Sequence, residues 1–455
     1  ANTMTADNLL NYVTGGNASN IDGMLNGIKN GQIGGNVYLL NPSGIMVGST
    51  GVVNVGNLTF STSSIGKQID TEKSIASILE GSASGDITIQ GKINTVTGAT
   101  LLGNTVKNSG VIQTGAAFTH DSSVVDFSDI VNANDLQYGT KLAVENGNIV
   151  ITADDNFENS GTISAHSTSG SDAVRITAPS VKLGGNILTG GASLEVKATD
   201  SIKVDNALLS TRQVAEDSTL ENIKNGTATG VGKAGNVSLA VNHTTYKDKA
   251  DININKSVID AAGTGAADTG GDVSIIASSQ DKLFAWAMTG PDATVTVKEA
   301  AIKGNNISLQ AIAKNDAADS PTFDELEDVN DAKNNDSLED LKNSGSSIGD
   351  TLVSTLGNLR VGASVSNVHA KAEVTLDDKA KLVADKDVQV STAATSAVES
   401  MLFSVFGGAG VAISDAQALT TVKSGAEIIA GNNVDVSAAT KNKITMSTKA
   451  IPVVA

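Results

Sequence analysis

The sequence predicts an all-β chain wound as a right-handed parallel β-helix, with short loop or helical insertions. Only 3% of its 455 residues are aromatic, so the core must be built from Val, Ile, Leu and Ala. Short segments in which apolar and polar residues alternate recur along the chain, as in strands with one buried face. Neighbouring copies, measured from Ala153 to Ala178 and from Ala178 to Ala198, lie 25 and 20 residues apart. That spacing is typical of one coil of a β-solenoid.

Each alternating segment is expected to be one strand of the helix. Gly and Asn between the segments suit corners, because these residues tolerate positive φ. With coils stacked about 4.8 Å apart, roughly 20 coils would give a rod about 100 Å long. An array of β-sandwiches is the alternative, but sandwich strands usually bring more aromatic residues and hairpin turns. The expected strands include residues 149–153, 174–178, 194–198, 237–239, 273–277, 307–311, 388–390 and 434–438.

A longer repeat appears in the second half of the chain. Residues 380–388 match residues 426–434 at an offset of 46, which we interpret as about two coils. An earlier copy covers residues 301–307, and the distance from Asn306 to Asp387 is 81 residues, 35 more than that offset. We therefore expect an insertion at residues 315–349. Asn305, Asn306, Asn432 and Asn433 are expected to stack into hydrogen-bonded ladders at a corner.

The expected insertion is strongly acidic. It holds ten carboxylates and one lysine between Asp316 and Asp340. Asp328, Asn330, Asp336 and Glu339 fall at positions 1, 3, 9 and 12 of a calcium-binding loop, but Ala332 and Lys333 occupy positions 5 and 6. A solvated loop is therefore favoured, and calcium binding is left as an open alternative.

Composition excludes several classes of function. The net charge of −18 argues against nucleic acid and against anionic membrane surfaces as partners. The absence of cysteine excludes disulfides and thiolate metal sites. No apolar run is long enough for a membrane-spanning helix. The start at Ala1 suggests a mature form or an excised fragment.

No residues stand out for catalysis, for a cofactor or for a metal. The four histidines, His120, His166, His243 and His369, are scattered along the chain. The adjacent carboxylates 154–155 and 377–378 would point to opposite faces of a strand, which does not make a catalytic pair. We expect no enzyme. Phe284 and Trp286 are candidate partner contacts, although aromatic rings more often pack against the flank of a solenoid.

The N-terminal segment contains a distinctive turn. An apolar strand at 37–40 is followed by Asn41, Pro42, Ser43, Gly44 and Ile45. In a β-turn Pro fixes φ and Gly is free to adopt positive φ, and Ile45 then returns the chain to the core. A Thr-Gly-Gly-Asn run precedes this turn and a Val-Asn-Val-Gly run follows it, at residues 14–17 and 53–56.

This combination resembles the secretion domain of two-partner-secretion exoproteins of the filamentous haemagglutinin type. The family's turn is Asn-Pro-Asn-Gly-Ile, and Ser43 stands at its third position here. The resemblance covers residues 8 to 65, and the family's first part, with its own Asn-Pro-Asn-Leu turn, is not evident. We therefore expect residues 1–135 to be part of such a domain, incomplete at its N-terminus. Residues 136–455 are expected to be β-solenoid repeats similar to those of leukotoxin-like filamentous adhesins.

The resemblance implies a secreted, cell-surface adhesin. Such chains are exported through an outer-membrane β-barrel transporter, and residues 41–45 would belong to the secretion motif. The expected targets are a protein or glycan on a host or bacterial surface, and self-association into filaments is an additional option. Two alternatives stay open: a self-assembling structural fibre or surface-layer subunit, and a β-helical polysaccharide-degrading enzyme.

Overall fold

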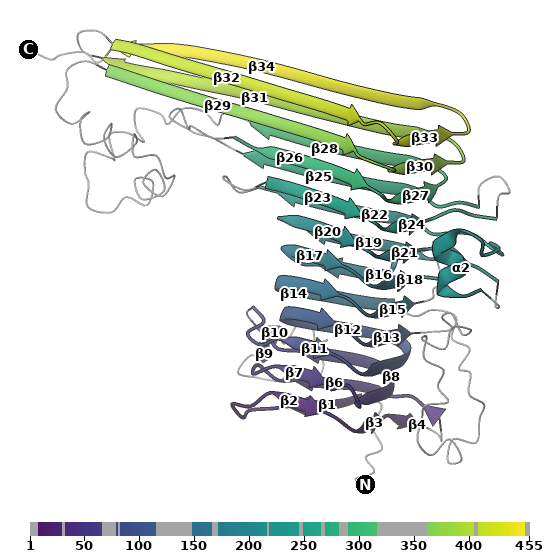
Figure 1. Ribbon diagram of the computed structural model, residues 1–455. Helices are drawn as coiled ribbons and strands as arrows, with labels where there is room; N and C mark the ends of the chain where they lie inside the picture. The colour runs from purple at the N-terminus through teal and green to yellow at the C-terminus, as the bar shows by residue number, and fades with distance from the viewer. Residues whose placement is uncertain are drawn as a thin grey trace, which may run out of the picture.

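Thirty of the described strands form one continuous sheet that wraps into three parallel faces, here called the first, second and third sheets, and the chain visits them in turn (Figure 1). In this computed structural model, the described residues are 8–29, 32–65, 79–80, 82–114, 148–165, 172–215, 218–244, 249–264, 269–281, 290–315, 362–404 and 408–450. Within them, each strand pairs in parallel with the equivalent strand of the next coil. The predicted parallel β-helix is confirmed.

Some strands turn a corner of the helix, and the parts of such a strand then belong to different sheets. The first sheet extends from the first described strand to the last. Its members are β1 (Asn8–Tyr12), β6 (Asn36–Leu40), the end of β8 (Val52–Ser61), the middle of β12 (Lys92–Asn108), the start of β14 (Asn148–Asn159), β16 (Asp172–Thr177), β19 (Ser193–Ala198), β22 (Val237–His243), β25 (Val273–Asp281), β28 (Ile307–Asn315), β31 (Val388–Ser404) and β34 (Val434–Ala450).

The second and third sheets complete each coil. The second contains β2 (Ser19–Ile21), β7 (Ile45–Val47), β11 (Ile87–Ile89), the ends of β12 and β14, β17 (Ser180–Leu183), β20 (Ser201–Asp205), β23 (Lys249–Asn255), β26 (Asp292–Lys298), β29 (Gly362–Leu376) and β32 (Gly408–Val422). The third contains β3 (Met24–Asn26), the starts of β8 and β12, β13 (Val111–Thr114), β15 (Thr162–Ala165), β18 (Asn186–Leu188), β21 (Leu208–Ser210), β24 (Val258–Asp260), β27 (Ala301–Gly304), β30 (Lys381–Ala384) and β33 (Glu427–Ala430).

The helix has fewer and larger coils than the sequence suggested. The third sheet contains eleven strand segments, so the described residues make eleven coils, and β34 starts a twelfth. At the inter-strand spacing this is about 50 Å of stack, not 100 Å. The 46-residue offset, interpreted as two coils, is one coil, because Lys381 pairs with Glu427. The coil is long because β31 has 17 residues and β32 has 15.

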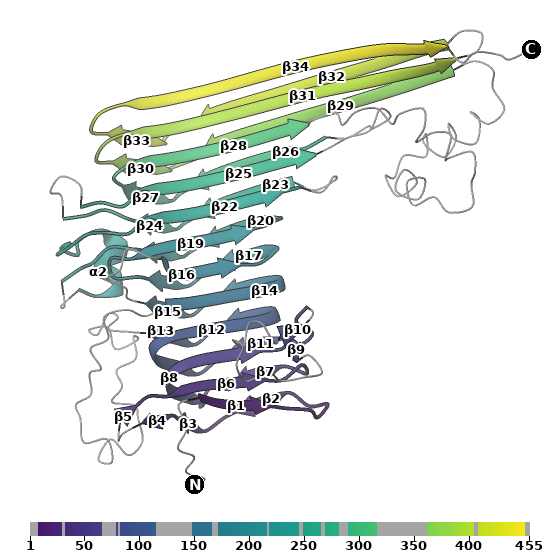
Figure 2. The ribbon, with the colours of Figure 1, turned by 180° about the vertical axis from the view of Figure 1, so that it is seen from behind.

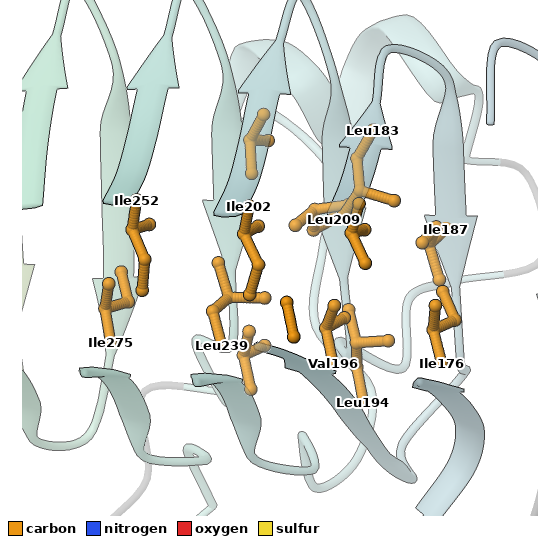
Figure 3. Packing of buried hydrophobic residues seen from close by; sticks show 14 of the residues in the cluster. Ile176, Leu183, Ile187, Leu194, Val196, Ile202, Leu209, Leu239, Ile252 and Ile275 are labelled. Atoms are coloured by element: carbon orange, nitrogen blue, oxygen red, sulfur yellow. The ribbon is translucent and has the colours of Figure 1, made fainter. Parts of the chain in front are cut away.

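The interior is one continuous aliphatic column. Alternate residues of each strand point inward, and buried side chains of successive coils stack on one another, as Figure 3 shows for Ile202 and Ile252. Phe60 and Phe157 are the largest fully buried side chains. The expected core of Val, Ile, Leu and Ala is thus present, with few rings.

One corner of the helix, between the second and third sheets, is built from very tight turns and is called the tight edge. A Cβ on Gly185 would lie 2.0 Å from the carbonyl oxygen of Gly161 in the coil before it, so glycine is required there. The same close contact recurs at Gly91, Gly110 and Gly161. In later coils the corner uses residues with positive φ: Asn206, Lys256, Glu299, Lys379 and Gly425.

The other two corners carry the long connections. Residues 211–215 and 218–236, together called the knob, lie at the corner between the third and first sheets and include α2 (Leu220–Asn225). Thr219 caps this helix by accepting a bond from the Asn222 N–H, and Gly226 ends it at φ 74°. Ile223 and Val214 pack with Leu188 and Leu208 of the third sheet.

The last strands reach past the body of the helix (Figure 2). β29 pairs with β26 only from Lys371 onward, and β31 pairs with β28 only as far as Ser396. Beyond these residues, β29 pairs with β32 and β31 with β34, which makes a two-layer extension with a small core of Val368 and Val398. The expected insertion at 315–349 lies outside the described residues, between β28 and β29.

Two short antiparallel pairs accompany the helix near its N-terminal end. They are β4 (Ile28–Lys29) with β5 (Gln32–Ile33), and β9 (Ser64–Ile65) with β10 (Leu79–Glu80).

Candidate functional site

The Asn41–Ile45 turn lies in the second coil, at the corner between β6 and β7. Asn41 is fully buried, and its Oδ1 accepts a hydrogen bond from the Ser43 N–H at 2.9 Å. The Gly44 N–H donates to the Asn41 carbonyl at 3.0 Å, and Gly44 has φ 116°. The side chain and backbone of Asn41 therefore close the turn together, and Gly44 supplies the conformation that other residues avoid.

The turn is bonded to the coil that precedes it. Asn41 Nδ2 donates to the Asn17 carbonyl at 3.0 Å and to Ser19 Oγ at 2.9 Å. Ser43 Oγ donates to the Gly15 carbonyl at 3.3 Å. The Thr-Gly-Gly-Asn run at residues 14–17 thus supplies two of these three acceptors, the carbonyl oxygens of Gly15 and Asn17.

The turn is also bonded to the coil that follows it. Ser84 Oγ donates to the Pro42 carbonyl at 2.8 Å, and the Ile45 N–H donates to the Asp86 carbonyl at 2.9 Å. A Cβ on Gly85 would lie 2.5 Å from the Gly44 nitrogen, so the two backbones are in direct contact. Ile45, 1% exposed, pairs with Ile87 in that coil. The turn therefore connects three successive coils.

A buried amide column was missed by the sequence reasoning. Asn54 Nδ2 donates to Asn26 Oδ1 at 2.8 Å, and Asn94 Nδ2 donates to Asn54 Oδ1 at 2.8 Å. Asn54 and Asn94 are fully buried. The column links the third-sheet strands of three coils. Its signal in the sequence is an asparagine in the middle of an apolar strand, as in Val53-Asn54-Val55.

The hydrogen bonds at the later corners run from asparagine side chains to aspartates of the preceding coil, which differs from the predicted stack of asparagines on one another. Asn305 and Asn306 both donate to Asp272 of the preceding coil, at 3.3 and 2.8 Å. Asn433 donates to Asp387 at 3.0 Å. The carboxylates of Asp272 and Asp387, which the sequence reasoning left out, are the acceptors.

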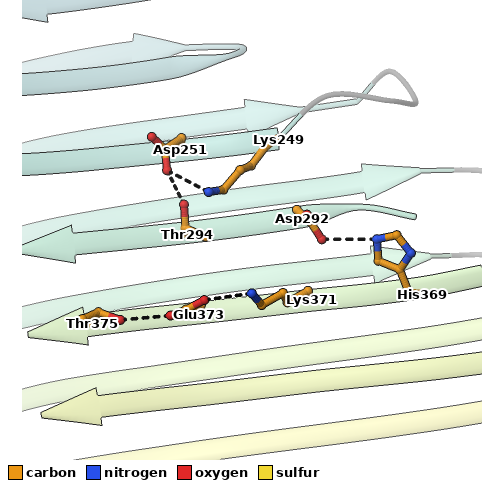
Figure 4. Close-up of polar contacts among 8 residues, drawn as sticks. All are labelled: Lys249, Asp251, Asp292, Thr294, His369, Lys371, Glu373 and Thr375. Atoms are coloured by element: carbon orange, nitrogen blue, oxygen red, sulfur yellow. Dashed lines mark hydrogen bonds and ion pairs between the residues drawn. The ribbon is translucent and has the colours of Figure 1, made fainter. Parts of the chain in front are cut away.

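A charged surface covers the second sheet near the C-terminal coils (Figure 4). Lys249 pairs with Asp251 at 3.4 Å, and Lys371 pairs with Glu373 at 3.1 Å. His369 Nε2 lies 3.4 Å from the Asp292 carboxylate. Bonding to Asp292 raises the pKa of His369, and its partial burial opposes this. All these groups are partly exposed, and their pattern is that of a solvated face rather than a catalytic centre.

The remaining candidate residues are separated in space or lie outside the described part of the chain. His243 is 3% exposed, and its Nδ1 lies 3.0 Å from the Thr199 carbonyl oxygen, so it is a buried structural residue. His120, His166, Phe284, Trp286 and the acidic insertion lie outside the described residues. In the part of the chain that the structure describes, no three His, Asp or Glu side chains are placed to hold a metal ion. None of the described helices is long and apolar enough to cross a membrane.

Comparison with protein families identifies the N-terminal part of the chain. Residues 1–192 match the family described as the TPS secretion domain. The match includes the Asn41–Ile45 turn and covers the range expected for the domain, residues 1–135, as well as residues 136–192. No curated protein matches the chain significantly. Residues 1–192 therefore belong to the TPS secretion domain family, and this match supports a two-partner-secretion exoprotein, exported across the outer membrane with the help of a transporter partner.

Proposed function

We propose that this exoprotein is a non-enzymatic adhesin of the cell surface, in which the β-helix displays contact surfaces for a protein or glycan of a host cell or another bacterium. The observation that carries this proposal is the division of the helix into one tight edge and two edges that bear insertions. Loops on a rigid scaffold are the usual carriers of recognition. Here the knob leaves the edge between the third and first sheets, and the β9–β10 pair leaves the edge between the first and second sheets.

The knob supports the adhesin proposal because the apolar side chains that anchor it are buried while its outer side chains are exposed. Ile223 and Val214 anchor it on the third sheet. Glu221, Lys224 and Val231 are exposed and make no contribution to that core. Such a surface can change its side chains without disturbing the stack of coils beneath it.

An attachment assay tests the adhesin proposal. Purified protein with Lys224→Glu and Val231→Asp in the knob, and protein with Phe284→Ala and Trp286→Ala, are compared with wild type for binding to host and bacterial cells. At least one pair should reduce binding about tenfold, which corresponds to about 1.4 kcal/mol. The control is Lys203→Glu on the second sheet, which should bind like wild type. Equal binding by all four proteins would contradict display at these edges.

The buried state of the secretion turn bears on how the transporter partner would recognise it. In the folded helix Asn41 is 0% exposed and Ile45 is 1% exposed, so these side chains are accessible only before the first three coils close. Ser43, in contrast, is exposed in the folded turn. We therefore place recognition of Asn41 and Ile45 on the unfolded chain. Asn41→Ala should weaken binding of the chemically unfolded chain to the transporter's periplasmic part. If only the folded protein binds, or if Asn41→Ala binds normally, this order of events is wrong.

A polysaccharide-degrading enzyme is the competing function. A screen of acidic polysaccharides for release of reducing or unsaturated sugars distinguishes the two. We expect no release above that of heat-unfolded protein, and any saturable release by the folded protein would replace the adhesin proposal with an enzymatic one.

A further inference from the structure

A column of oxygen-bearing side chains runs along the corner at which the third sheet passes the chain to the first sheet. One residue in each of six successive coils contributes. Five of them directly precede a first-sheet strand, and the first occupies the same position at the start of β19. This register column consists of Ser193, Asn236, Asp272, Asn306, Asp387 and Asn433.

Every step of the register column uses the same bond in the same direction. The backbone N–H of the later coil donates to the side-chain oxygen of the earlier coil. The five donor–acceptor distances are 3.0 Å from Asn236 to Ser193, 2.9 Å from Asp272 to Asn236, 3.1 Å from Asn306 to Asp272, 3.3 Å from Asp387 to Asn306 and 3.1 Å from Asn433 to Asp387. Each coil thus presents an acceptor to the coil that folds onto it.

From Asn236 to Asn433, uncharged amide side chains alternate with negatively charged carboxylates along the column. Asn306 separates the carboxylates of Asp272 and Asp387, and Asn236 and Asn433 flank them. Each carboxylate also receives a side-chain amide from the next coil, Asn306 Nδ2 at 2.8 Å and Asn433 Nδ2 at 3.0 Å. Because stacked coils are about 4.8 Å apart, aspartates in two adjacent coils would place like charges opposite each other.

We propose that the register column determines which coil can stack on which. Two conditions define it: each member supplies an acceptor oxygen to the backbone N–H of the following coil, and a coil with a carboxylate is followed by a coil with an uncharged side chain. The residue type at this corner then acts as a matching element between neighbouring coils, independent of the aliphatic core, which is similar in all of them.

Three variants at Asn306 separate the two conditions. Asn306→Ala removes the acceptor, Asn306→Asp keeps it and places three carboxylates in successive coils, and Asn306→Ser keeps an uncharged acceptor like that of Ser193. The triple variant Asp272→Asn, Asn306→Asp, Asp387→Asn restores alternation in the inverse order. Peptide-resolved hydrogen exchange over residues 301–311 and 381–391 of the full chain is the measurement.

The proposal predicts how the hydrogen-exchange rates of the variants compare with that of wild type. Asn306→Asp should exchange about fivefold faster than wild type in both peptides, in line with the size of cross-strand charge effects, and 1 M salt should remove most of the difference. Asn306→Ala should speed exchange independently of salt, and Asn306→Ser should resemble wild type. The triple variant should return to the wild-type rate. If Asn306→Asp does not fold at all, a triple variant that does fold supports the proposal, because it contains the Asn306→Asp change without carboxylates in the adjacent coils. A triple variant as unprotected as Asn306→Asp, or an Asn306→Asp protein as protected as wild type, overturns the proposal.

Discussion

At the scale of single residues, backbone contact between coils decides where glycine is required. Gly184 and Gly185 are neighbours in one turn of the tight edge. A Cβ on Gly185 would lie 2.0 Å from a backbone oxygen, whereas a Cβ on Gly184 would lie 3.5 Å from its nearest neighbour. Alanine substitutions at the two positions therefore make the same chemical change in nearly the same sequence, and only the contact of the new methyl group differs.

Gly185→Ala should destabilise the protein by about 2 kcal/mol or more, because backbone atoms of two coils must move apart. Gly184→Ala should be near neutral, since its new methyl meets only ordinary contacts. Denaturant unfolding of both variants is the measurement. Similar denaturation midpoints for the two variants would show that the backbone of the tight edge can move to accommodate a methyl group at position 185.

The buried amide column gives a second residue-scale test. Asn54→Ala removes the acceptor of Asn94 Nδ2 and leaves that buried donor without a partner, which should cost about 1 to 3 kcal/mol. Asn26→Ala should cost less, because Asn26 is exposed at the end of the column. Unfolding free energies of the two variants decide this. An Asn26→Ala protein less stable than Asn54→Ala would show that the interior of the column does not matter.

At the scale of elements, alternation in the sequence predicted the strands well but not the length of the later coils. Segments such as Leu194 to Ala198 have a strict period of two, and they are strands. The 46-residue repeat was misread because β31 and β32 continue beyond the body of the helix, and length alone does not reveal that. Likewise, the Asn41 turn was evident from its residues, whereas its bonds to two other coils depend on which coils lie next to it.

His369 joins three elements on the second sheet and should make their contact depend on pH. It lies beside Asp292 of β26, opposite Asp415 of β32 and near Lys371 of its own strand. Because the folded state raises the pKa of His369, its protonated form adds stability at pH below about 6.5, and this is lost as pH rises through the folded pKa. The gain is at most about 1 kcal/mol, since the pair is exposed to solvent.

Wild type should therefore be more stable than His369→Gln at about pH 5.5, and the two proteins should converge at about pH 8.5. Chemical unfolding at both pH values is the measurement, with Asp292→Asn as the control that should weaken the pH-dependent difference. A difference that grows toward high pH would mean that the charged form of His369 is disfavoured in the folded protein.

At the scale of the whole molecule, the helix is a linear stack in which each coil contacts only its neighbours. The aliphatic column is continuous, yet the strand pairings join only successive coils. In such a stack, stability is a sum of coil and interface contributions, and a local defect should remain local. This property suits a chain that is exported across the outer membrane, because the coils can close one after another.

Ile252 tests this locality. It is fully buried in β23, between Ile202 of the preceding coil and Val295 of the following coil. Ile252→Ala should cost about 2 to 5 kcal/mol locally and speed hydrogen exchange in β20, β23 and β26, while β7 and β11 keep their wild-type protection. Asn253→Ala, which changes the adjacent outward side chain, is the matched control and should leave all five strands protected. Loss of protection in β7 together with β23 would mean that the stack unfolds as one cooperative unit, and then secretion could not be coupled to closure of one coil at a time.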